Sequence, residues 1–111
     1  MKALVLFTGM LLTGADAFGA DPHVDIQKFA FVPKEITVAP GTAVTWTNLD
    51  ETPHTLKASD GSFASKALDT SDTFQQTFSK EGDYTYFCTL HPFMTGTVHV
   101  RGGGGSAGGG Q

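Results

Sequence analysis

Three side chains that can bind a soft metal ion occur at intervals of three residues in one short segment. Cys88, His91 and Met94 belong to the run Cys-Thr-Leu-His-Pro-Phe-Met, which directly follows one expected strand and precedes another. A compact loop that leaves a strand end can curl so that the thiolate, the imidazole and the thioether converge on one point. Such a donor set favours copper over magnesium, calcium or manganese. The segment therefore predicts a copper site.

A second imidazole would complete this set, because two His and one Cys with a weak axial Met form the blue-copper site of electron-transfer proteins. The chain has four histidines. His99 alternates with two valines and is expected to face solvent, and His23 stands at the start of the first expected strand. His54 follows a proline in the loop after the strand that contains Trp46, and this loop can lie at the same end of the fold as Cys88. His54 is therefore the predicted fourth ligand.

The elements that would hold these residues are short strands. Runs rich in Val, Ile, Thr, Phe and Tyr are separated by Gly, Pro, Asp and Asn, and no helical periodicity is sustained. About seven to eight strands at regular spacing predict an all-β fold, a Greek-key β-sandwich. Residues 62–71 are expected to form a loop with at most one helical turn. The expected strands cover residues 24–31, 35–39, 42–48, 54–58, 73–79, 84–88 and 96–100.

Both ends of the chain resemble segments that lie outside a folded domain. Lys2 is followed by a short apolar run and an Ala-Asp-Ala site, which is the layout of a secretory signal peptide. Residues 1–17 are therefore expected to be removed, with cleavage after Ala20 as the alternative, and the protein is expected in the periplasm. Residues 18–101 form the predicted domain, and the glycine-rich residues 102–111 form a flexible tail.

The net charge and the cysteine content further limit the possible functions. The formal net charge is −4, which argues against a nucleic-acid partner because such a partner requires a basic face. The apolar run near the start is too short to span a membrane. Cys88 is the only cysteine, so it cannot form an internal disulfide. A bare thiol in an oxidising compartment is a liability unless something occupies it, which again favours a metal.

The combination of motifs resembles the cupredoxin family of type 1 blue-copper proteins, of the amicyanin and plastocyanin kind. Each motif is ordinary in a β-sandwich, whereas all of them in this order are specific to the family. Leu90 departs from the amicyanin pattern, which has a second proline there, so the subfamily stays open. The motifs are Phe29-Ala30-Phe31-x-Pro33, Gly41-x-x-Val44-x-Trp46-x-Asn48, Pro53-His54, Gly82-x-Tyr84-x-Tyr86-x-Cys88 and Met94-x-Gly96.

The resemblance implies a small soluble blue-copper protein that is not an enzyme and shuttles single electrons between a donor and an acceptor. It implies one type 1 copper per chain, bound by Nδ1 of His54 and of His91, by the Cys88 thiolate and, axially, by Met94. For Asn48 it implies a supporting role, in which the side chain pins the histidine-bearing loop and supports a hydrogen bond near the cysteine sulfur.

The surroundings of His91 predict where a redox partner would dock. Four apolar residues are expected close to this histidine, and an exposed imidazole edge within a small apolar patch suits brief, weak docking and rapid release. The protein is expected to be a monomer that meets its partners only transiently. The residues are Pro53, Leu90, Pro92 and Phe93.

Two other functions would use the same residues. A periplasmic copper carrier or storage protein would hand over copper, although delivery sites use exchangeable Met and His ligands and a buried thiolate binds copper tightly. A structural zinc site suits two His and one Cys but leaves Met94 unexplained. Enzyme activity is not expected, because Phe87 and Thr89 flank Cys88 where multicopper enzymes have histidines that lead to further coppers.

Overall fold

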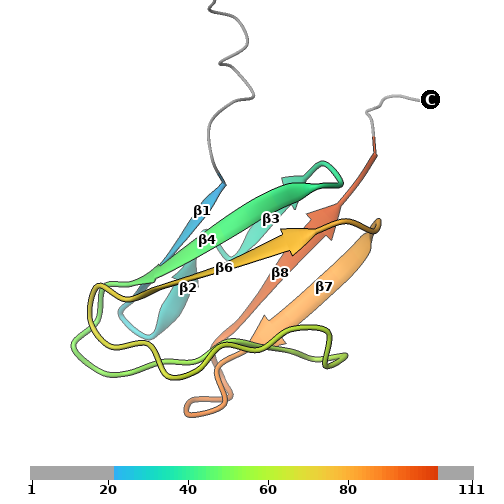
Figure 1. The fold of residues 1–111 in the computed structure, drawn as a ribbon. Helices are drawn as coiled ribbons and strands as arrows, with labels where there is room; N and C mark the ends of the chain where they lie inside the picture. Colours follow the sequence, from blue (N-terminus) through green and yellow to red (C-terminus); the bar gives the residue numbers. More distant parts are fainter. Residues whose placement is uncertain (1–21, 103–111) are drawn as a thin grey trace, which may run out of the picture.

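The computed structural model describes residues 22–102, which form two four-stranded sheets packed face to face (Figure 1). One sheet has the strand order β2-β1-β4-β6 and the other the order β3-β8-β7-β5. The expected all-β Greek-key sandwich is confirmed, and none of the described residues forms a helix that could span a membrane. The strands are β1 (His23–Gln27), β2 (Ala30–Val32), β3 (Glu35–Val38), β4 (Thr42–Asn48), β5 (Lys57–Ala58), β6 (Thr73–Phe78), β7 (Gly82–Phe87) and β8 (Thr95–Val100).

Both sheets are mixed, because β1 runs parallel to β4 and β3 runs parallel to β8. The other pairs are antiparallel, and β7 and β8 flank the loop that contains Cys88 and Met94. Residues at alternate positions along the strands fill the space between the sheets, as the period of two requires. Trp46 lies at the centre of this core, with the ring of Tyr86 edge-on at a centroid distance of 5.4 Å. Gly96 leaves room for that tyrosine, since a Cβ there would overlap its ring.

The expected single strand over residues 24–31 is wrong. The chain reverses within it, because β1 and β2 form an antiparallel hairpin in which Gln27 pairs with Ala30. The two turn residues, Lys28 and Phe29, have φ angles of 54° and 58°. A two-residue hairpin turn of this kind normally has Asn or Gly at positions of positive φ, so the sequence carried no turn signal here.

The segment between β4 and β6 also differs from expectation. The predicted strand over residues 54–58 contracts to β5, and His54 instead forms an isolated bridge with Leu68. A second bridge joins Lys57 to Ala64, so residues 62–71 fold back along the preceding segment and form no helical turn. The expected signal peptide and nearly all of the expected glycine-rich tail lie outside the described residues.

His99 lies on the outer face of β8, as predicted, although two carboxylates cover part of it. Its Nδ1 lies 2.7 Å from Asp83 on β7, and its Nε2 lies 2.8 Å from Glu35 on β3. Arg101 contacts the same Asp83 oxygen at 2.6 Å. The hydrogen bonds that His99 donates to Glu35 and to Asp83 raise the pKa of His99 above its ordinary value of 6.5. This network joins three neighbouring strands across the outside of one sheet.

We expect the network to make stability depend on pH. A histidine whose pKa is higher in the folded than in the unfolded protein stabilises the fold fully below the unfolded pKa of about 6.5. The contribution disappears as the pH rises through the folded pKa. Replacing His99 by Gln should therefore lower the free energy of unfolding most near pH 6 and least near pH 9, in urea unfolding of the copper-free protein. A difference that does not change between these pH values would contradict the expectation.

Candidate metal centre

Three of the four predicted ligands meet at one end of the sandwich. The ligand atoms of His54, Cys88 and His91 all lie within 4.8 Å of one another. The Cys88 sulfur is 3.8 Å from Nδ1 of His54 and 3.7 Å from Nδ1 of His91. His54 and Cys88 are fully buried, His91 is half-buried, and Met94 from the same loop is 2% exposed. The arrangement is that of a type 1 copper site, with the two Nδ1 atoms facing the sulfur.

Backbone hydrogen bonds explain why donors spaced by three can converge. The N–H of His91 donates to the carbonyl of Cys88 at 3.2 Å, and the N–H of Met94 donates to the carbonyl of His91 at 2.9 Å. The N–H of Cys88 then donates to the carbonyl of Met94 at 3.1 Å, which closes the loop. Each three-residue step is thus one turn, so the successive metal-ligating side chains return to the same side of the loop.

The loop that carries His54 is fixed by backbone and side-chain bonds. His54 and Leu68 exchange two backbone hydrogen bonds of 3.1 and 2.7 Å. The buried side-chain amide of Asn48 donates to the carbonyls of Thr52 and Leu68 at 3.0 and 2.9 Å. Asn48 therefore occupies the loop-pinning position that the resemblance implied, and it acts from the end of β4.

Thr55 connects the two halves of the centre. Its backbone N–H donates to the Cys88 sulfur at 3.4 Å. Its hydroxyl oxygen accepts a hydrogen bond from the N–H of Thr89 at 2.8 Å and lies 2.7 Å from the Thr89 hydroxyl. The hydrogen bond to the sulfur is therefore donated by Thr55, whereas Asn48 fixes the loop that contains Thr55. This role could not be recognised from the sequence, because threonine is common in strands.

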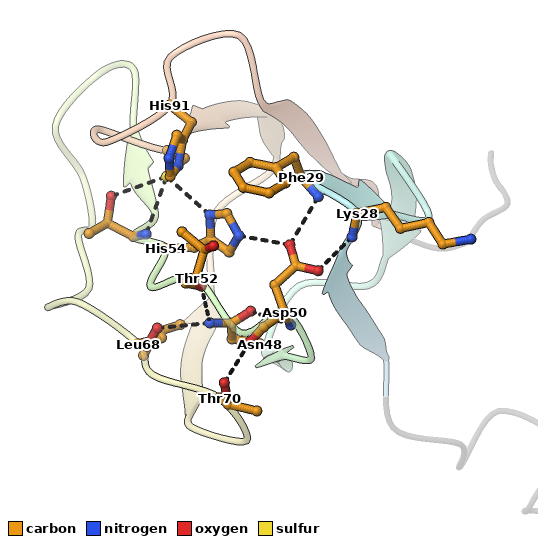
Figure 2. Close-up of polar contacts among 11 residues, drawn as sticks. Lys28, Phe29, Asn48, Asp50, Thr52, His54, Leu68, Thr70 and His91 are labelled. Carbon is orange, nitrogen blue, oxygen red and sulfur yellow. Dashed lines mark hydrogen bonds and ion pairs between the residues drawn. The ribbon is translucent and has the colours of Figure 1, made fainter.

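Asp50 was also missed, and it contacts the far side of the His54 ring. Its Oδ2 atom lies 2.8 Å from Nε2 of His54 (Figure 2). That nitrogen therefore carries the proton, and the Nδ1 lone pair is directed at the Cys88 sulfur. Partial burial would raise the pKa of the Asp50 carboxyl, but hydrogen bonds from the Phe29 N–H, His54 and the Lys28 N–H outweigh it and lower the pKa. Asp50 is therefore ionised at neutral pH.

An apolar surface surrounds the half-buried His91. Phe93 is 71% exposed and Leu90 is 53% exposed, so Phe93 is not a core residue. Pro53 and Pro92 are exposed as well. The predicted patch residues thus all reach solvent from the loops at this end of the molecule. Phe29, which the sequence did not place here, also lies against His91 and is 40% exposed.

The chemistry of the donor set fits copper. Cys88 is buried and has no disulfide partner, and its sulfur accepts a hydrogen bond that stabilises a thiolate. The metal-ligating cluster found among residues 22–102 consists of two imidazoles and this thiol, without a carboxylate. Soft sulfur and borderline imidazole ligands select copper or zinc over hard cations, and the buried thioether of Met94 favours copper.

A sandwich that holds two His, one Cys and one Met at one end defines a type 1 copper protein, and the comparisons agree. Residues 20–101 match the family described as copper binding proteins, plastocyanin/azurin family, and the chain belongs to this family. It is 34% identical over 101 residues to amicyanin-alpha of Methylorubrum extorquens, covering 86% of this chain and 85% of that protein.

Solved structures give the same result. A purple cupredoxin from Nitrosopumilus maritimus superposes with a TM-score of 0.68 at 33% identity, covering 73% of this chain and 100% of the other. Amicyanin from Paracoccus versutus superposes with a TM-score of 0.67 at 34% identity, covering 73% of this chain and 81% of the other. The family and the His-Cys-His-Met arrangement identify a blue-copper electron-transfer protein whose cofactor is copper.

Proposed function

We propose that His54, Cys88, His91 and Met94 bind one copper ion through which the protein passes single electrons between redox partners. The convergence of three ligand atoms within 4.8 Å, from segments more than 30 residues apart, is the observation that carries the proposal. Bound copper would supply the one-electron change between Cu(II) and Cu(I). The chain's own residues bind it, limit rearrangement around it and give partners access to it.

Each ligand would contribute a different property. The thiolate of Cys88 is shielded from solvent and accepts the Thr55 N–H, so it binds copper strongly without reacting with external oxidants. His54 is held at its other ring nitrogen by Asp50 and cannot rotate freely. A frame that fixes the ligands between the geometries preferred by the two oxidation states limits rearrangement during electron transfer.

His91 would be the point where electrons enter and leave. It is the least buried of the proposed ligands, and Phe93 and Leu90 are strongly exposed on the same loop. Small apolar contact areas suit weak encounters that release quickly. The donor and the acceptor would therefore dock in turn on this apolar surface, with the protein acting as a monomer.

The proposed location is the periplasm, on the evidence of the first 17 residues, which have the layout of a cleaved export signal.

A copper carrier or storage protein is the competing function. The complete burial of Cys88 and the near-complete burial of Met94 argue against it, because ligands that hand over a metal must be reached by the acceptor. Catalysis is not proposed, because Phe87 and Thr89 place no imidazole next to Cys88.

The first test is the visible absorption spectrum of the purified domain after addition of Cu(II) and then of ascorbate. We expect an intense blue thiolate-to-copper band that bleaches on reduction and returns on reoxidation. Replacing Cys88 by Ser should abolish the band, and replacing His54 by Gln should abolish or strongly shift it. Replacing the exposed His23 by Gln is the matched control and should leave the band unchanged.

Two results would contradict the proposal. A blue band that survives in the Cys88→Ser variant would show that the thiolate is not a ligand. Loss of copper to a Cu(I) chelator within a few redox cycles would favour the copper carrier, because an electron carrier must keep its metal.

The docking surface can be tested by electron self-exchange, measured from NMR line broadening in mixtures of the oxidised and reduced protein. Replacing Phe93 by Ser should slow exchange about tenfold, the effect of losing about 1.4 kcal/mol of encounter stability. The potential and the spectrum should not change. Val32→Ser, at an exposed apolar residue of β2, is the control. Equal rates in the wild type and both variants would show that electrons do not leave through this surface.

A further inference from the structure

The turn between β1 and β2 has an unfavourable backbone for its sequence. Lys28 and Phe29 both lie in the left-handed region, with φ angles of 54° and 58°. Residues with a Cβ seldom adopt this conformation, and two in succession persist only when their surroundings hold them there. The turn therefore needs an external partner that compensates for its conformation.

The partner is the carboxylate of Asp50, more than 20 residues away in the sequence. Its Oδ1 accepts the N–H of Lys28 at 2.7 Å, and its Oδ2 accepts the N–H of Phe29 at 2.9 Å (Figure 2). Oδ2 also accepts the Nε2–H of His54 at 2.8 Å. One side chain thus binds both amides of the turn and the far side of a proposed copper ligand.

Asp50 is itself held in place from both sides. Its N–H donates to the side-chain oxygen of Asn48 at 2.9 Å, and its carbonyl accepts the hydroxyl of Thr70 at 2.6 Å. The Asp50 side chain is 14% exposed. Its position is therefore set by the same loop that carries His54.

Because the turn is anchored in this way, the Phe29 ring lies over the metal centre. The ring lies edge-on to His54 with centroids 5.1 Å apart and an interplanar angle of 90°. It lies edge-on to His91 as well, with centroids 4.9 Å apart and an angle of 83°. The two imidazoles are 5.1 Å from each other, so one aromatic ring covers both. A different turn conformation would move this ring away.

We propose that Asp50 is a positioning residue of the copper centre: its carboxylate orients the His54 ring and holds the Lys28–Phe29 turn so that Phe29 covers both imidazoles. The inference rests on the proposed copper site. A carboxylate bonded to the far nitrogen makes an imidazole a stronger donor. It therefore stabilises Cu(II) over Cu(I) and lowers the reduction potential, while Phe29 limits access to the ligands.

The reduction potential separates this role from a general charge effect. Asp50→Asn should raise the potential, because the neutral amide removes the charge beside His54. Glu51→Gln removes the same charge at the next, exposed residue and should raise the potential much less. Equal shifts in the two variants would overturn the electrostatic part of the proposal, because they would reflect the net charge of the loop alone.

Copper removal tests whether Asp50 acts through Phe29. A Cu(I) chelator should extract copper faster from Phe29→Ala and from Asp50→Asn than from the wild type. The factor by which copper loss speeds up in the double variant should be smaller than the product of the factors for the two single variants, because both substitutions displace the same ring. Independent, multiplicative effects would show that Asp50 does not position Phe29.

Amide hydrogen exchange in the copper-free protein supplies a measurement that needs no metal. In Asp50→Asn the N–H groups of Lys28 and Phe29 should exchange about tenfold faster or more, as expected when charge-assisted bonds are replaced. Glu51→Gln should leave both rates unchanged. Unchanged exchange in Asp50→Asn would overturn the turn-holding role. A wild-type protein without a blue band would instead refute the copper site, and the exchange rates would still test the anchor.

Discussion

The metal centre depends on one junction, at which the backbone N–H of Thr55 meets the sulfur of Cys88. The pairing of β5 with β7 sets this junction, because Lys57 lies opposite Phe87 and the residues just beyond them come together at the strand ends. The threonine bonds to Thr89 then fix the distance between the two loops. If this junction opened, the two loops that carry His54 and Cys88 would no longer be held together.

The distribution of buried polar groups shows how the sandwich supports that junction. The three buried polar residues among residues 22–102 are Asn48, His54 and Thr55, all at the metal centre. The remainder of the core is apolar and aromatic. A buried polar group that loses its partner costs about 1–3 kcal/mol, so each of these residues favours the single arrangement in which all are bonded. Rigidity is therefore concentrated where an electron-transfer site requires it.

Part of the fold and of the metal centre could be predicted from the sequence, because it depends on the local spacing of residues. The run from Cys88 to Met94 contains its own turn geometry, and the alternation in β4, β7 and β8 fixes which residues face inward. Asp50, Thr55 and Phe29 could not be found in this way, because their roles depend on contacts between distant segments. The hairpin at Lys28 was missed for the same reason, since a remote carboxylate compensates for a turn that its own residues disfavour.

We expect the protein frame, and not the metal, to set the positions of the ligands. Crystal structures of the copper-free, Cu(I) and Cu(II) forms at one pH would test this expectation. We predict the same side-chain rotamers for His54 and Cys88, and the same contact from Thr55 to the sulfur, in all three forms. A His54 ring that turns away from Asp50, or a junction that opens when copper is removed or reduced, would contradict it.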